Sequence, residues 1–123
     1  KQIKFVRLPV SAPFHCPLMK NATLDMRQKI INSNFTKPYV EIISNVSASS
    51  LNDPEIIKKL LIDQIEKPVR WRESIIKMIN LNINNFIEIG PGKVLSGLVK
   101  RIDRNVNINQ VNNLQDLKKY ENE

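Results

Sequence analysis

Two adjacent residues near the start of the sequence, His15 and Cys16, carry the side chains best suited to chemistry. Histidine titrates near neutral pH, so His15, held between Pro13 and Pro17, could act as a positioned general base. On residue type alone, a structural or simply exposed histidine is the alternative. Cys16 could be a nucleophile, but adjacent residues of an extended chain point to opposite sides, which is poor geometry for activation by His15. We therefore interpret Cys16 as a small buried thiol.

Two further segments could bind a ligand, and each also has a structural interpretation. The loop Gly90-Pro91-Gly92-Lys93 could hold an anion through its backbone N–H groups and the lysine charge. It lacks the glycine spacing of a P-loop or a dinucleotide site, so a tight turn between a strand and a helix is favoured. Trp71, flanked by Arg70 and Arg72, could stack on a base. Apolar residues follow Trp71 at helical spacing, which favours a place in the core.

The composition is that of one folded domain. The 123 residues are 41% hydrophobic and 25% charged, which suffices for one core. The single cysteine and single histidine exclude an internal disulfide, a cysteine-rich zinc site and a histidine-rich metal site, and a free thiol fits a reducing compartment. No apolar run is long enough to cross a bilayer, and the start at Lys1 without an initiator Met leads us to expect a processed or truncated chain.

The net charge of +7 favours an acidic partner, which could be nucleic acid, an anionic membrane or an acidic protein. Charge alone does not choose among these. A serine nucleophile in a GxSxG turn, the usual arrangement in α/β hydrolases, is absent, because the only glycines are Gly90, Gly92 and Gly97.

The hydrophobic pattern alternates between the strand period and the helix period. Residues 3–8 predict a half-buried strand, and the prolines that follow disfavour helix until about Leu18. A mostly apolar strand over 39–46 is expected to be covered on both faces. The other predicted elements are helices over 18–31, 54–67, 71–79, 93–102 and 114–120, and strands over 86–89 and 106–111. This alternation predicts an α/β fold with a mainly parallel sheet and flanking helices.

Two of these helices have well-defined apolar stripes. Asn52 or Asp53 is expected to cap the helix that begins at Pro54. The residues expected to face inward are Ile56, Ile57, Leu60, Leu61 and Ile65 in that helix, and Val94, Leu95, Leu98, Val99 and Ile102 in the helix over 93–102.

Four segments, in order and with matching spacings from about Phe5 to Ile102, resemble the malonyl-CoA:acyl carrier protein transacylase family. They are Leu8-Pro9-Val10-Ser11-Ala12-Pro13-Phe14-His15-Cys16, Asn45-Val46, Gln64 with Pro68-Val69-Arg70-Trp71, and Glu88-Ile89-Gly90-Pro91-Gly92-Lys93-Val94-Leu95. The resemblance implies that residues 1–123 are the C-terminal part of a single acyltransferase domain, within its large α/β-hydrolase-like subdomain. Residues 1–8 would be the strand that returns from the smaller ferredoxin-like subdomain.

The resemblance implies transfer of malonyl from CoA to the phosphopantetheine thiol of acyl carrier protein, through a seryl ester, in type II fatty acid synthesis. Malonyl-CoA would be a substrate, and no cofactor is implied. His15 would be the general base, and a backbone carbonyl at Gln64 would fix its tautomer. Phe14 resembles the Phe that precedes this His in malonyl-selective domains of large synthases, where it crowds a substituent at the second carbon of the substrate. Some free-standing malonyl enzymes carry Ser there instead.

Three parts of the family pattern have no counterpart in this sequence: the nucleophilic Ser, a Gln-containing loop near the oxyanion hole, and an Arg that pairs with the malonyl carboxylate. We expect the chain to be inactive alone and to need the upstream half of the same polypeptide. Acyl carrier protein is strongly acidic, so it would dock on a basic face. Two faces are possible, Lys100 with Arg101 and Arg104, or Lys58 with Lys59 and Lys67.

Other interpretations remain open at this level. A basic non-catalytic nucleic-acid-binding module is suggested by the charge and by Arg70-Trp71-Arg72, although dispersed charges and the lack of a nucleic-acid motif weigh against it. The same fold could also belong to a larger synthase or be an inactive remnant. We expect neither nucleic acid nor membrane as a partner, and a plastid-type organelle or the cytoplasm as the compartment.

Overall fold

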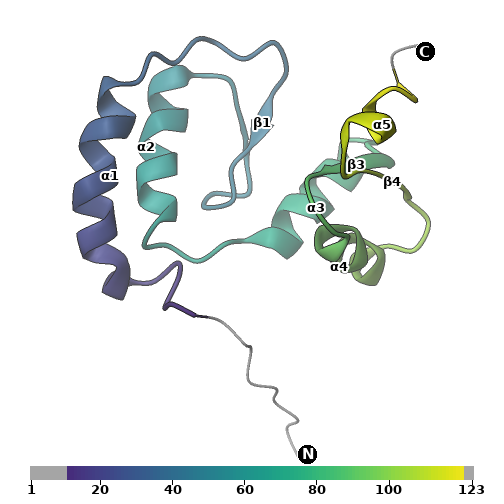
Figure 1. The fold of residues 1–123 in the computed structure, drawn as a ribbon, viewed down its shortest axis with the longest axis horizontal. Coiled ribbons are helices and arrows are strands. Elements are labelled where there is room, and N and C mark those ends of the chain that lie inside the picture. The colour runs from purple at the N-terminus through teal and green to yellow at the C-terminus, as the bar shows by residue number, and fades with distance from the viewer. Residues whose placement is uncertain (1–10, 121–123) are drawn as a thin grey trace, which may run out of the picture. The chain divides into compact units, whose positions relative to one another are not determined.

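The computed structural model describes residues 11–120, and the chain divides into two compact units, Lys1–Val69 and Arg70–Glu123 (Figure 1). The units are joined by the segment that follows Gln64. The strand predicted over residues 3–8 lies outside the described residues. Helices and strands are mixed along the chain, as predicted for an α/β protein, but they do not alternate strictly.

The first unit contains two long helices that lie side by side (Figure 1). A short 3-10 turn, Pro17–Met19, leads into α1, Lys20–Asn32, and α2 spans Pro54–Gln64. Of the two predicted caps, Asp53 is the one used, because its carboxylate accepts from the backbone N–H groups of Glu55 at 2.8 Å and Ile56 at 3.2 Å.

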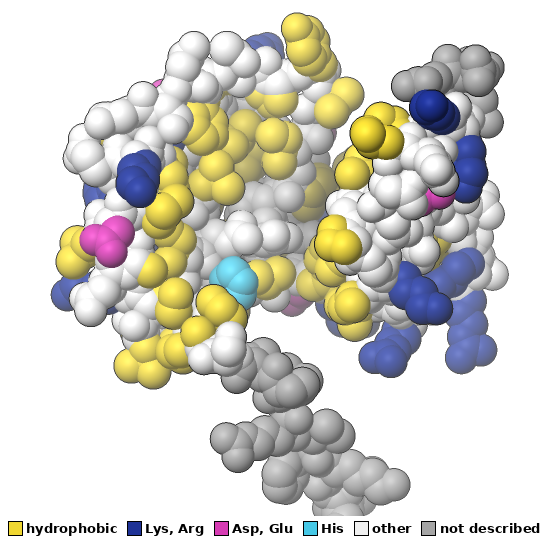
Figure 2. Space-filling model, in the orientation of Figure 1, with side chains coloured by type: hydrophobic (Ala, Val, Ile, Leu, Met, Phe, Trp, Pro, Cys, Tyr) yellow, Lys and Arg dark blue, Asp and Glu magenta, His cyan; other side chains and the backbone are white. Residues whose placement is uncertain are grey.

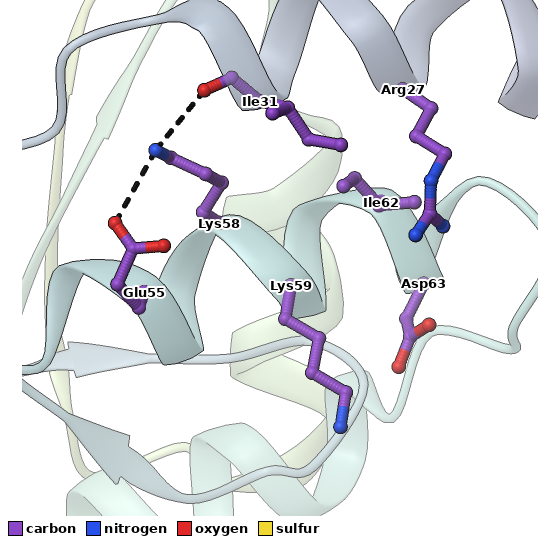
Figure 3. Close-up of a pocket in the computed structure, with 7 residues that line it drawn as sticks. All are labelled: Arg27, Ile31, Glu55, Lys58, Lys59, Ile62 and Asp63. Atoms are coloured by element: carbon purple, nitrogen blue, oxygen red, sulfur yellow. Dashed lines mark hydrogen bonds and ion pairs between the residues drawn. The ribbon is translucent and has the colours of Figure 1, made fainter.

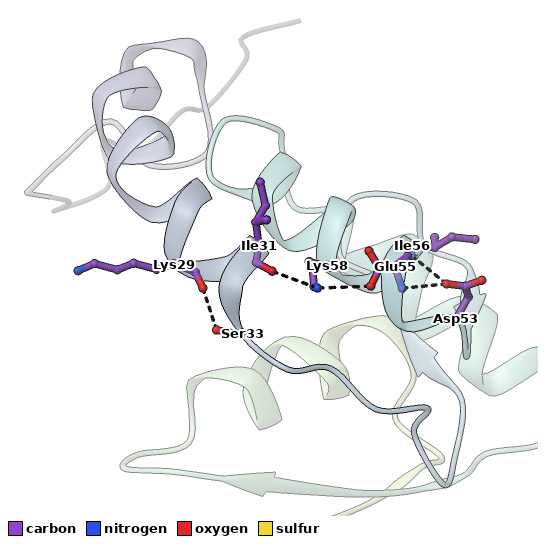
Figure 4. A network of polar contacts seen from close by, with 7 residues as sticks. All are labelled: Lys29, Ile31, Ser33, Asp53, Glu55, Ile56 and Lys58. Atoms are coloured by element: carbon purple, nitrogen blue, oxygen red, sulfur yellow. Dashed lines mark hydrogen bonds and ion pairs between the residues drawn. The ribbon is translucent and has the colours of Figure 1, made fainter.

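A lysine of α2 ties the two helices together (Figure 4). The ammonium group of Lys58 donates to the carbonyl of Ile31, in the last turn of α1, and to the Glu55 carboxylate, both at 3.3 Å. It also lies 5.3 Å from the centre of the Phe35 ring. A helix C-terminus carries partial negative charge, so this cation is well placed. The side chain of Lys58 is only 14% exposed and is part of the packing between α1 and α2.

The strand predicted over 39–46 is much shorter than expected. The structure has a hairpin in which β1, Ile42–Ile43, pairs antiparallel with β2, Ser50–Leu51. The hydroxyl of Ser44 accepts from the N–H groups of Val46 and Ser47, which turns the chain out of the extended conformation. Tyr39 and Val40, which precede β1, are exposed, so the prediction of a strand covered on both faces was wrong for this region.

The second unit is built on a parallel pair of strands. It runs through α3, Trp71–Asn80; β3, Asn85–Ile89; α4, Val94–Ile102; β4, Asn107–Val111; and α5, Leu114–Leu117. Asn85 pairs with Asn107 at one end of β3 and β4, and Ile89 pairs with Val111 at the other. The predicted parallel arrangement therefore holds for β3 and β4, whereas β1 and β2 are antiparallel.

The core of this unit is apolar and centres on Ile75, which is 1% exposed, with Val99 and Val106. Trp71 and Phe86 pack against this cluster. The opposite face of β3 carries Ile87 and Ile89, whose exposures are 49% and 80%, because successive side chains of a strand alternate in direction.

The buried sides of α2 and α4 match the predicted stripes only in part: Ile57 and Val99 are buried as predicted, and other members of the stripes are not. In α2 the buried residues are Ile57 and Ile62, whereas Ile56 and Leu61 are exposed. Ile62 lies one turn after Lys58, so it is on the side of α2 that faces α1. In α4 the buried residues are Ser96 and Val99, whereas Val94 and Leu95 are exposed. The reason is a polar contact between Ser96 and β3.

That contact is made by Glu88, which joins β3 to the start of α4. Its carboxylate accepts from the N–H of Leu95 at 3.0 Å, the N–H of Ser96 at 2.8 Å and the hydroxyl of Ser96 at 2.5 Å. The Ser96 hydroxyl lowers the pKa of the Glu88 carboxyl below its ordinary value; partial desolvation opposes this effect and the two N–H groups add to it. The N–H groups in the first turn of α4 are thus already bound to a carboxylate of this chain, that of Glu88.

The loop between β3 and α4 is a tight turn held to the end of β4. Gly90 and Gly92 both have positive φ, where other residues are strained. The N–H of Gly90 donates to the carbonyl of Val111, and the N–H of Gly92 donates to the side-chain oxygen of Asn112 at 2.8 Å. These partners support the structural interpretation of the Gly90-Pro91-Gly92-Lys93 loop over anion binding.

The cap of α2 gives the first prediction. Asp53→Ala should lower the free energy of unfolding by about 1 kcal/mol, since two N–H groups of the first turn lose their acceptor. Asn52→Ala, at the other predicted cap, should change it by less than about 0.5 kcal/mol. Urea unfolding followed by far-UV circular dichroism measures both. A larger loss for Asn52→Ala than for Asp53→Ala would contradict the assignment.

The contacts of Glu88 predict a pH dependence. A carboxyl with a lowered pKa in the folded state stabilises the fold above its unfolded pKa, and that stabilisation is lost as the pH falls through the folded pKa. The free energy of unfolding should therefore fall as the pH drops below about 4.5, the ordinary pKa of this carboxyl, and it should fall less steeply in Glu88→Gln. Trp71, the only tryptophan, reports on this unit by fluorescence. Glu41→Gln, an exposed position in the other unit, is the control, and equal slopes for Glu88→Gln and the unmodified chain would refute the prediction.

Candidate functional site

His15 lies in a tight turn that precedes α1 and has an unusual backbone conformation. Its φ is 59°, in the left-handed region, which non-glycine residues occupy at a cost of order 1–3 kcal/mol. The turn is closed by hydrogen bonds on both sides of the histidine. The N–H of Phe14 donates to the carbonyl of Ala12 at 2.9 Å, and the thiol of Cys16 donates to the carbonyl of Pro13 at 3.1 Å. Local contacts thus hold the backbone of this turn.

The imidazole has one well-defined partner, the backbone carbonyl of Gln64. The distance from Nδ1 of His15 to this oxygen is 2.7 Å. A carbonyl oxygen only accepts, so Nδ1 must carry the hydrogen, and in the neutral ring Nε2 then holds a lone pair. Figure 2 shows the imidazole at the surface with apolar side chains around it. The arrangement suits a side chain that accepts a proton at Nε2.

The carbonyl of Gln64 is available because of the residue four positions later. Gln64 is the last residue of α2, and a helical carbonyl normally accepts from the N–H four residues on. Here that residue is Pro68, which has no N–H. The helix predicted over 54–67 ends directly before this proline. The spacing of Gln64 and Pro68 was the signal that would have identified the freed carbonyl.

The other candidate residues from the sequence are partly exposed or belong to the core. The ring of Phe14, directly before His15, is 55% exposed. Cys16 is a free, half-buried thiol, so it is less buried than predicted. Trp71 packs against the core, and Arg70 forms an ion pair with Glu73 at 3.9 Å, which does not support a base-stacking platform.

An apolar hollow lies beside Gln64 in the first unit. It has a volume of about 290 Å³ and lies between the β1–β2 hairpin and α2. Its walls are Ile42, Ile43, Leu51, Ile57, Leu60 and Leu61, with Ser44, Asn45 and Gln64 as the polar groups. Asn45 belongs to one of the segments that carry the family resemblance. The hollow can bury apolar atoms next to the helix end that holds His15.

Two kinds of site are not found among residues 11–120. No group of three or more His, Cys, Asp or Glu side chains is placed to hold a metal ion. No helix in this part of the chain has the length and apolar character needed to cross a bilayer.

Comparisons with known proteins agree in sequence and in structure. No family model matches the chain. A malonyl CoA-acyl carrier protein transacylase of Bacillus subtilis is 46% identical over 99 residues, which are 80% of this chain and 31% of that protein. The crystal structure of an acyl-carrier-protein S-malonyltransferase from Bartonella henselae superposes with a TM-score of 0.84 at 40% identity, covering 94% of this chain and 37% of that one.

A third similar structure is a malonyl-transacylase in complex with its type II polyketide synthase acyl-carrier protein. It has a TM-score of 0.81 and 34% identity, and the match covers 94% of this chain and 38% of that one. The chain thus spans about a third of the length of the relatives it matches. In sequence and in fold, it is homologous to that part of the malonyl CoA-acyl carrier protein transacylases.

Proposed function

We propose that this chain supplies the general base of a malonyl-CoA:acyl carrier protein transacylase, with His15 as that base. The observation that carries the proposal is the hydrogen bond of 2.7 Å from Nδ1 of His15 to the carbonyl of Gln64, which leaves Nε2 able to accept a proton. The nucleophilic Ser would come from the remaining two thirds of a transacylase's length, upstream in the same polypeptide. This chain would then be the C-terminal part of the acyltransferase domain.

The proposed reaction has two half-reactions. In the first, Nε2 of His15 takes the proton of the Ser hydroxyl while its oxygen attacks the thioester carbonyl of malonyl-CoA. The C–S bond breaks, and the CoA sulfur leaves with that proton from the imidazolium. In the second, Nε2 takes the proton of the phosphopantetheine thiol of acyl carrier protein while the thiol sulfur attacks the carbonyl of the malonyl ester. The C–O bond to Ser breaks, and the Ser oxygen takes the proton back from the imidazolium.

The surroundings of His15 fit both states of the ring. The neutral form keeps the correct tautomer through the Gln64 carbonyl. The imidazolium formed during the reaction lies at the C-terminus of α2, where the helix carries partial negative charge. A carbonyl and a helix end thereby take the place of the carboxylate found in a Ser-His-Asp triad.

Substrate, compartment and cofactor follow from the same proposal. Phe14, with its exposed ring beside His15, would disfavour substrates substituted at the second carbon. The chemistry needs no cofactor, because malonyl-CoA is itself a substrate. The free thiol of Cys16 fits a reducing compartment, the cytoplasm or a plastid-type organelle, and the pathway would be type II fatty acid synthesis.

The base is tested in a joined polypeptide, in which this chain is fused to the unmatched two thirds of the Bacillus subtilis relative. His15→Ala should lower malonyl transfer to acyl carrier protein by about a hundredfold or more, because a general base is lost. Cys16→Ala, at the adjacent side chain, should retain most of the activity. Equal transfer by His15→Ala and the unmodified joined polypeptide would remove His15 from the mechanism.

Pro68 is proposed as a positioning residue for the base. Pro68→Ala adds an N–H four residues after Gln64, and this donor competes with His15 for the carbonyl. The nitrogen chemical shifts of the imidazole should show a smaller share of the Nδ1–H tautomer, and the transfer rate of the joined polypeptide should fall severalfold. Pro54→Ala, at the other end of α2, frees no such donor and is the control. An unchanged tautomer and rate in Pro68→Ala would overturn this role.

A further inference from the structure

We propose that Lys58 is a positioning residue for the base, because it fixes α1 along α2 and thereby keeps His15 at hydrogen-bond distance from Gln64. The inference rests on the proposed function, in which His15 is the base. Lys58 and Gln64 are six residues apart on α2, which is about 9 Å along the helix axis. Lys58 therefore acts through the placement of α1 and not through contact with the imidazole.

α1 and α2 are tied at both ends, and each tie uses the same kind of backbone group. At one end, His15, in the turn before α1, donates to the carbonyl of Gln64, the last residue of α2. At the other end, the ammonium group of Lys58 donates to the carbonyl of Ile31, in the last turn of α1. Carbonyls in a last turn have no helical N–H to accept from. Within residues 11–120, these are the two hydrogen bonds that join α2 to α1 or to the turn before it.

Apolar packing gives α1 little hold on its neighbour. None of its thirteen residues is buried, and Leu24 and Met26 are 61% and 42% exposed. Packed helices shift against one another by about 1–2 Å in conformational changes. A shift of that size is enough to lengthen a contact of 2.7 Å beyond hydrogen-bond distance. The two polar ties therefore contribute much of what fixes α1 along α2.

Lys58 suits this role because its charge is enclosed at the contact. Its side chain is only 14% exposed, and its ammonium group lies between the Ile31 carbonyl and the Glu55 carboxylate in the groove between the helices (Figure 3). The centre of the Phe35 ring is 5.3 Å away. An ammonium group removed from water is costly to leave without acceptors. A shift of α1 that withdrew the Ile31 carbonyl would therefore be opposed.

The neighbouring lysine, Lys59, provides a matched contrast. It lines the same groove, but it is exposed and forms no ion pair within residues 11–120. Adjacent residues of a helix point about 100° apart around the axis. The two lysines thus have the same charge and the same helix, and Lys58 is the one that donates to α1.

The test replaces each lysine by methionine in the 123-residue chain. Lys58→Met keeps nearly the length of the side chain, and Glu55, which is 79% exposed, stays solvated, so no buried charge is left unpaired. Lys58→Gln, a shorter and neutral side chain, is a second variant with the same expected loss. Lys58→Arg keeps a cationic donor and should restore the unmodified behaviour. Circular dichroism shows that each variant is folded.

The readout is the tautomer of His15, the only histidine of the chain, from the nitrogen chemical shifts of its imidazole. The share of the Nδ1–H tautomer should fall in Lys58→Met and in Lys58→Gln, and should stay unchanged in Lys59→Met. Equal shares in these two Lys58 variants and the unmodified chain would overturn the proposal. An equal loss in Lys59→Met would overturn it too.

A destabilised variant with the tie intact separates position from stability. Asp53→Ala removes the cap of α2 without changing the contact between Lys58 and Ile31. Its Nδ1–H share should therefore stay as in the unmodified chain when both are measured well below their unfolding temperatures. A change in Asp53→Ala as large as that in Lys58→Met would mean that Lys58 acts only through overall stability, and the positioning role would be refuted.

The joined polypeptide measures the effect on the reaction. Lys58→Met should lower the maximal rate of malonyl ester formation by about fivefold, the effect of weakening one hydrogen bond, and leave the KM for malonyl-CoA within about twofold. Lys59→Met should keep the same rate within about twofold. A raised KM with an unchanged maximal rate would count against positioning of the base. The tautomer is read without catalysis, so an active His15→Ala would refute the base alone.

Discussion

The hydrogen bond between His15 and the carbonyl of Gln64 is the interaction on which the candidate site depends. It joins a loop near the start of the chain to the end of a helix almost fifty residues later. The local structure restricts both the Gln64 carbonyl and the His15 imidazole to this contact. The carbonyl has no helical donor because Pro68 follows four residues later, and the imidazole is directed by a turn with a strained backbone at His15.

In each unit, a side chain pairs with backbone groups that a helix end leaves without a partner, at a C-terminus in the first unit and at an N-terminus in the second. A helix leaves carbonyls unpaired at its C-terminus and N–H groups unpaired at its N-terminus. At the end of α2, the donor that meets the carbonyl is an imidazole, which uses its Nδ1 for this contact. At the start of α4, the acceptor is the Glu88 carboxylate, which uses its oxygens on Leu95 and Ser96. One helix end therefore contacts an imidazole, and the other already contacts a carboxylate.

The fold could be predicted from the sequence where local signals were strong. The proline at the first turn of α2, the acceptor at Asp53 and the glycine turn after β3 led to correct helix and strand positions. The buried faces were less predictable. Ser96 is buried and Leu95 exposed because of a hydrogen bond to Glu88, eight residues away, which apolar periodicity does not detect. The strand predicted over 39–46 was too long at its far end because the Ser44 hydroxyl turns the chain directly after β1.

The candidate site was predictable from its residue types and their family pattern, whereas its geometry was not. The pairing of His15 with Gln64 follows from the resemblance, but the tautomer depends on the contact of Nδ1 with a backbone oxygen. The charge pairing within the two basic clusters likewise required the structure. Lys58 and Lys100 look alike in sequence, yet one is buried beside Glu55 and the other is held by neutral carbonyls.

The apolar side of β3 has a practical consequence for handling this chain. Ile87 and Ile89 are solvent-facing on a two-stranded ribbon, and exposed apolar strands readily add further strands from other molecules. Produced on its own, the chain is a candidate for aggregation and for capture by chaperones. Its solubility should then depend on concentration, and co-synthesis with the rest of a transacylase would be the gentler route to pure material.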